Sequence, residues 1–129
     1  MYAAITRPAT GRRAFTILAQ EAGVQRGNEP QRLLDQKEYR AAIIAAMTNL
    51  EATLRERLDK QSWTDVRRPL ALRALVERAI AAQILPQESR ELVFSWIKLR
   101  NEAVHTPKPV TRAEAKAVVD GVERILALT

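Results

Sequence analysis

The residue pattern between Tyr39 and Leu58 constrains the fold more than any other feature of this chain. Apolar side chains recur there at spacings of three and four, which is the repeat of one face of an α-helix. Just before this stretch, Asp35 is followed three residues later by Glu38, the pattern of a capping box that starts a helix. We therefore expect a long helix that opens near Asp35 and runs to about Lys60. Its apolar face comprises Tyr39, Ala42, Ile43, Ala46, Met47, Leu50, Leu54 and Leu58.

Prolines mark where the next two helices begin and end. Pro69 precedes a second helix, expected to end near Ile84, and Pro86 begins a third. The third helix must stop at about His105, because Thr106 precedes Pro107 and a residue before proline is displaced from the α region. The second helix is expected to present on its inner face Leu72, Leu75, Val76, Ala79, Ile80 and Gln83. The third carries Leu92, Val93, Trp96, Ile97, Leu99, Ala103 and Val104.

Thr111 and Glu114 form a second capping-box pattern, which predicts the start of a last helix. Gly121, in the middle of this helix, marks a point where another element can approach closely. The side chains expected to face inward are Ala115, Val118, Val119, Val122, Ile125 and Leu126.

The N-terminal segment, residues 1–27, carries weaker signals. Arg12 to Ala22 are compatible with a short helix that Gly23 would cap, and a short turn is expected to lead from Asn28 to Asp35. With only four Gly in 129 residues, the composition is helical. We expect an all-α protein: an N-terminal arm or short helix over residues 1–27, and one domain over residues 28–129 folded as an up-and-down bundle of four to five helices.

Composition also excludes several classes of function. The chain has no Cys and a single His, which rules out disulfide scaffolds, thiolate nucleophiles and a two-His metal site within one chain, so neither a metal nor another cofactor is expected. No apolar run has the length of a membrane span and no secretory leader is recognisable, so a cytoplasmic location is expected. The net charge of +6 favours polyanionic partners. Because the excess is spread evenly along the chain, any basic patch must be assembled by folding.

Four polar groups crowd the end of the third predicted helix. His105 is the natural candidate for proton transfer, since its unperturbed pKa lies near neutrality. Asn101 and Glu102 precede it by four and three residues, where either side chain could orient the imidazole. Arg100 lies about 140° around a regular helix from His105, so the two share a face only if the last turn unwinds. The Thr106-Pro107 break gives a reason for such unwinding.

This set of residues best suits cleavage of a phosphodiester. Arg100 would hold the non-bridging oxygens while His105 moves protons, and RNA supplies its own nucleophile, the 2′-hydroxyl. The reaction needs both a base and an acid, so a second His105 would have to come from a two-fold partner. Candidate phosphate contacts are Lys98, Lys108 and Arg112. The alternative is that His105 merely caps a helix and that the cations only face solvent.

The residues Arg100-Asn101-Glu102-Ala103-Val104-His105 resemble the signature of the HEPN superfamily, in which an Arg and a polar residue precede a His. The stretch from Ala45 to Arg55 also resembles the long helix of such domains, and the resemblance covers about residues 28–129. Members of this superfamily are typically metal-independent endoribonucleases that act as dimers, with the Arg and His of both chains lining one cleft.

The resemblance implies roles for three residues. Arg100 would stabilise phosphate charge, Asn101 would support the site and His105 would transfer protons, leaving a 2′,3′-cyclic phosphate and a 5′-hydroxyl. It also implies a toxin–antitoxin or antiviral defence setting, with RNA as substrate, a homodimer, and an antitoxin or a larger defence protein as further partner. Some HEPN toxins carry a modified Tyr two positions after the His, and here that position is Pro107, so that mode of silencing is not expected. Some members of the superfamily are inactive. The alternative for this chain is therefore a non-catalytic RNA-binding, dimerisation or scaffold module.

Overall fold

The computed structural model describes residues 28–60 and 71–129, and within these ranges every regular element is helical. A helix over residues 28–35 is followed by α2 (Tyr39–Lys60), α3 (Leu72–Ala81), the short 3-10 helix η1 (Gln87–Ser89), α4 (Arg90–His105) and α5 (Arg112–Leu128). The all-α prediction is confirmed for this part of the chain. The arm at residues 1–27 and the helix start at Pro69 were predicted at positions outside the described residues.

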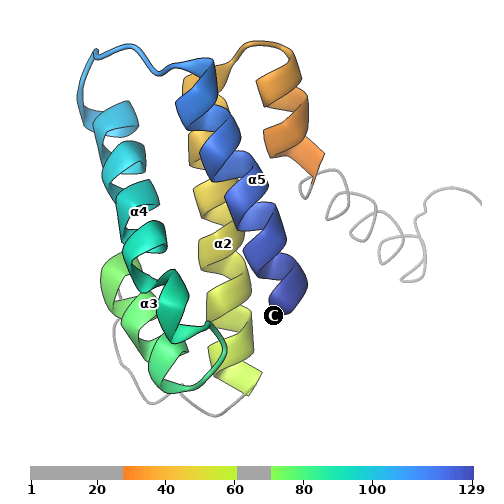
Figure 1. Ribbon diagram of the computed structural model, residues 1–129, viewed down its shortest axis with the longest axis vertical. Helices are drawn as coiled ribbons and strands as arrows, with labels where there is room; N and C mark the ends of the chain where they lie inside the picture. Colours follow the sequence, from red (N-terminus) through yellow and green to blue (C-terminus); the bar gives the residue numbers. More distant parts are fainter. Residues whose placement is uncertain (1–27, 61–70) are drawn as a thin grey trace, which may run out of the picture.

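The helices form a bundle around α2, which packs against α3, α4 and α5 (Figure 1). In the figure α4 runs opposite to both α2 and α5, and the shorter α3 lies beside one half of α4. The predicted stripe on α2 is buried from Ala42 to Leu58, with Tyr39 packed against its edge. On α5 the predicted inward residues are buried from Ala115 to Ile125, while Leu126 packs partly buried beside them. The three-and-four spacing therefore identified the core faces of the two helices that contact each other most.

The predicted cap at Asp35 is wrong. Asp35 is the last residue of the helix over 28–35, and α2 begins only at Tyr39. Between the two helices Lys37 takes a left-handed conformation, with φ 64°. The Lys37 N–H donates to Leu34 O and the Glu38 N–H donates to Leu33 O, the two hydrogen bonds of a Schellman helix end. The segment expected to be a turn is therefore a helix, and the Asp-to-Glu spacing marks its end.

Gln83 was predicted on the inner face of the second helix, and this is also wrong. The helix α3 ends at Ala81, and Gln83 lies exposed in a left-handed conformation with φ 63°. The Gln83 N–H donates to Ile80 O and the Ile84 N–H donates to Ala79 O, so this end is a second Schellman motif. The turn brings Leu85 into the core, where it is buried.

The capping box at the start of α5 is confirmed. Thr111 Oγ1 accepts from the Glu114 N–H at 3.1 Å, and the Glu114 carboxylate accepts from the Thr111 N–H at 3.0 Å. This backbone hydrogen bond holds the pKa of Glu114 below its ordinary value of 4.5, and the charge of Lys108 adds to the lowering while burial opposes it.

We expect the stability of the protein to depend on the charge of Glu114. Because its folded pKa is lowered, its contribution is complete above the unfolded pKa and is lost as the pH falls through the folded pKa. Glu114→Gln should lower the free energy of unfolding by about 0.5–1 kcal/mol at neutral pH. Urea titrations of both proteins from neutral pH down to about pH 3 measure the difference, which should shrink in acid. A difference that stays constant over this range would contradict the assignment.

Candidate functional site

An open groove of about 610 Å³ runs along α4 from Glu91 to Thr106. Lys98, Asn101 and His105 line one side, and Arg73 of α3 contributes from the other. The groove exists because α3 begins at Leu72, beside Phe94 of α4. Among the described residues, no helix therefore covers the last turns of α4 on the side where α3 lies. Three of the predicted site residues are therefore brought together on one surface.

Cation–π contacts and an ion pair join α3 to α4 at the start of this groove. The Arg73 guanidinium carbon lies 4.4 Å from the centroid of the Phe94 ring, and that of Arg90 lies 4.6 Å from it. Arg90 also pairs with Glu77 of α3 at 2.8 Å, and this hydrogen bond lowers the pKa of Glu77. Arg73 and Phe94 were missed as groove residues, because nothing in the local sequence shows that α3 starts opposite Phe94.

Arg100 does not line the groove. The helix stays regular through its last turn, since the Thr106 N–H donates to Glu102 O at 3.0 Å. The unwinding that would bring Arg100 and His105 to one face therefore does not occur, and about 140° separates them around the axis. Arg100 lies half-buried on the core side of α4, where its Nε is buried and has no hydrogen-bond partner among the residues that the structure describes.

His105 is exposed at the end of α4. Within the described ranges, the neighbouring polar side chains of Asn101 and Glu102 make no hydrogen bond to its imidazole. Glu102 contributes through its backbone instead, since Thr106 Oγ1 donates to the Glu102 carbonyl at 2.8 Å. The imidazole is thus free to meet a ligand or another chain.

Arg40 of α2 fixes the end of α4 and the loop that follows. Its guanidinium donates to the carbonyl oxygens of Ala103, Thr106 and Lys108, the last at 2.6 Å. A cation at the C-terminal end of a helix also interacts favourably with the helix dipole. The local sequence gives no sign of this role, because the contacts join residues 63 to 68 positions apart.

The other two predicted phosphate contacts lie away from the groove lining. Lys108 is exposed in the loop after α4, and its charge acts on Glu114 at the start of α5. Arg112 is exposed in the first turn of α5. Of the three predicted cations, Lys98 is the one that lines the groove.

Trp96 is only 2% exposed and belongs to the core, while Phe94 is partly buried against it. The described residues include no cluster of three or more potential metal ligands. Within the same ranges, no helix combines the length and the hydropathy that crossing a bilayer requires.

Comparisons of the chain with protein-family models, with curated proteins and with solved structures find no match.

Proposed function

We propose that this chain is a metal-independent endoribonuclease with a HEPN-like helical bundle fold, and that two copies form its active site. The proposal rests on the HEPN-type spacing of Arg100, Asn101 and His105, combined with where these residues lie on α4. Asn101 and His105 line an open groove that also holds the cation Lys98. This combination offers a proton-transfer group and a phosphate-binding charge on one accessible surface.

The observation that carries the proposal is the exposure of Val104. This residue is 49% exposed on the core side of α4, just beyond the last inward-facing residue, Ala103. Around the helix axis, Val104 lies between Arg100 and His105, about 40° from the first and 100° from the second. An exposed apolar side chain flanked by two polar groups suits an interface between chains.

A two-fold axis near Val104 would solve the geometric problem of a single chain. Arg100 and His105 of one copy cannot reach one phosphate, but Arg100 of one copy and His105 of the other can meet across such an axis.

The chemistry follows from these roles. One His105 accepts the proton of the 2′-hydroxyl as its oxygen attacks phosphorus, and the second His105 donates a proton to the departing 5′-oxygen. Arg100 stabilises the negative charge that builds up on the non-bridging oxygens. The products are a 2′,3′-cyclic phosphate and a 5′-hydroxyl. A toxin–antitoxin or antiviral defence setting, with an antitoxin or larger defence protein as partner, belongs to the same proposal.

An RNA cleavage assay in excess EDTA tests the chemistry. We expect the protein to cut single-stranded RNA, and Arg100→Ala and His105→Ala each to slow cutting by about 100-fold or more. Arg124→Ala, an exposed arginine on α5, is the matched control and should cut normally. Circular dichroism checks that each variant folds. Cleavage that survives both substitutions, or that requires added metal, contradicts the proposal.

The dimer is tested separately through Val104→Glu. A carboxylate near the two-fold axis is repelled by the same carboxylate of the other copy. The variant should therefore elute as a monomer in size-exclusion chromatography and lose RNA-cleaving activity. A wild-type protein that is monomeric at assay concentration, or a Val104→Glu variant that stays dimeric and active, excludes the composite site.

A non-catalytic RNA-binding or dimerisation module is the second candidate. The separation of Arg100 and His105 on different faces of α4 favours it, because one chain alone does not assemble the pair. RNA binding without cleavage in the EDTA assay identifies this alternative, and its affinity should fall with added salt.

A further inference from the structure

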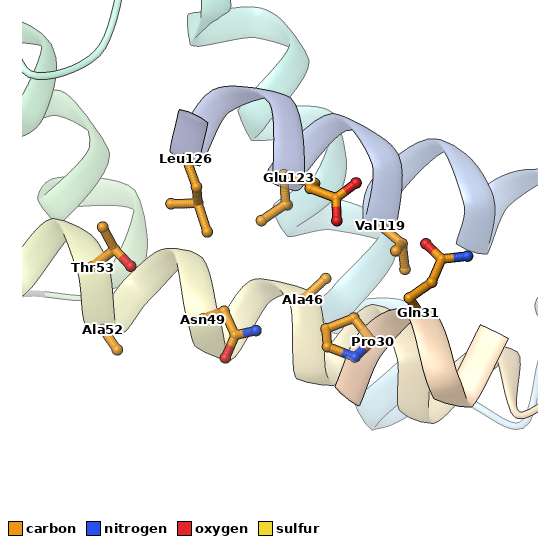
Figure 2. Close-up of a pocket in the computed structure, with 10 residues that line it drawn as sticks. Pro30, Gln31, Ala46, Asn49, Ala52, Thr53, Val119, Glu123 and Leu126 are labelled. Atoms are coloured by element: carbon orange, nitrogen blue, oxygen red, sulfur yellow. The ribbon is translucent and has the colours of Figure 1, made fainter. Parts of the chain in front are cut away.

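A second groove, of about 290 Å³, lies between α2, α5 and the helix over residues 28–35 (Figure 2). The α2 side of the groove is formed by two small apolar residues, Ala46 and Ala52, and two polar residues, Asn49 and Thr53. Leu126 of α5 lies at one end of the groove in the figure, and Val119 of α5 lies near Pro30 at the other end. No role in the proposed ribonuclease reaction falls on this surface, because it lies on the side of α2 that faces α5 and not α4.

We propose that residues 12–22 of the same chain dock into this groove as a short amphipathic helix. The chain enters the described structure at the groove itself, since Pro30 and Gln31 both line it. Residues 23–27, with Gly at both ends, can span up to about 18 Å. A helix of residues 12–22 would be about 16 Å long, and the groove along α5 from Val119 to Leu126 is about 10 Å. The segment is therefore long enough to fill the groove and close enough to reach it.

The sequence of this segment matches the groove in polarity. In a helix over residues 12–22, Phe15 and Leu18 would share one face, and Ile17 would lie on the opposite face. These two bulky side chains would pack against the apolar lining residues Ala46, Val119 and Leu126. The same face of such a helix would also include Ala14, Ala19 and Ala22.

Charge complementarity gives a second reason. Glu123 lines the groove, is exposed, and has no ion pair with any other residue that the structure describes. Arg12 and Arg13 open the docking segment and would bring positive charge to the groove edge. The proposal does not depend on ribonuclease activity, since it concerns a different surface.

Cysteine cross-linking of the full-length chain tests the docking, because the native sequence has no Cys. Ala19→Cys on the segment is paired with Thr53→Cys in the groove, and the protein is treated with a short bis-maleimide. The control pairs Ala19→Cys with Ala117→Cys, an exposed position about 160° around α5 from Val119. We expect the groove pair to give at least about tenfold more intramolecular product than the control pair.

Substitutions in the segment separate docking from chance encounter. Leu18→Ser should reduce the cross-link strongly, whereas the neighbouring Ile17→Ser should leave it unchanged. In the cysteine-free protein, Leu18→Ser should also increase binding of a hydrophobic dye several-fold over Ile17→Ser, by uncovering the groove. Equal cross-linking of the groove and control pairs overturns the proposal. A product of dimer size overturns it as well, since the segment would then occupy the groove of a second copy.

Discussion

Replacing Gly121 by valine should lower the free energy of unfolding by about 3 kcal/mol. Gly121 is buried in the middle of α5, and its φ is not positive, so the backbone does not require glycine. Space does: a Cβ at this position would lie 2.7 Å from Cη2 of Trp96 and 3.2 Å from Cε2, and closer still to Cζ2. Because Trp96 is 2% exposed, its rigid ring has no free volume into which it can move.

Chemical denaturation of three variants checks this prediction. Ala117→Val, on the exposed face of α5, carries the helix-propensity cost of valine without the clash and should lose only about 0.5 kcal/mol. Trp96→Leu leaves a cavity beside Gly121. In the Trp96→Leu protein, Gly121→Val should therefore lower the free energy of unfolding by at least about 1 kcal/mol less than it does in the wild type. A Gly121→Val protein as stable as the wild type would show that α4 and α5 pack less tightly than the structure indicates.

The same position shows how far the sequence alone could predict the fold. A glycine inside an apolar helical pattern predicted a close approach on α5, but the identity of its neighbour depends on how α4 and α5 pack. The core stripes of α2 and α5 were predictable because each helix buries one face along most of its length. On α4 the apolar pattern predicted burial less well. Leu92 belongs to this pattern but is 50% exposed, because no other helix among the described residues covers that position.

Two similar patterns had opposite outcomes. Thr111 and Glu114 start α5 as predicted, whereas Asp35 and Glu38 lie at the end of one helix and before the next. The local spacing of the two pairs is identical, so it cannot distinguish them. What differs is the preceding segment. A helix already exists before Asp35 and ends at Lys37, whose left-handed backbone conformation residues other than glycine seldom adopt.

Part of the candidate site was predictable from helix geometry. The separation of Arg100 and His105 follows from the rotation of about 100° per residue, and the regular last turn of α4 preserves it. The groove beside His105 was not predictable, because it depends on where α3 begins relative to α4. Arg40 was not predictable either, since an arginine on a solvated helix face and one that binds a distant loop look the same in sequence.

Arg40→Ala should lower the free energy of unfolding by about 2–3 kcal/mol. The guanidinium of Arg40 donates to three backbone carbonyls, of which that of Ala103 is partly buried and those of Thr106 and Lys108 are exposed. Water can replace the two exposed hydrogen bonds, so most of the loss arises at Ala103 and from the unbalanced C-terminal dipole of α4. Arg40→Lys should recover less than half of the loss, because one ammonium group cannot reach three acceptors in the geometry that a planar guanidinium fits.

Urea denaturation measures these losses, with Arg32→Ala as the control. Arg32 is an exposed arginine paired with Glu29 at 3.2 Å, so its removal should cost less than about 0.5 kcal/mol. Amide hydrogen exchange gives a local readout: in Arg40→Ala the amides from Thr106 to Thr111 should exchange faster, while those in the middle of α2 keep protection in proportion to global stability. If Arg40→Ala matched Arg32→Ala in both measurements, the loop after His105 would owe its position to the packing of α4 and α5 and not to Arg40.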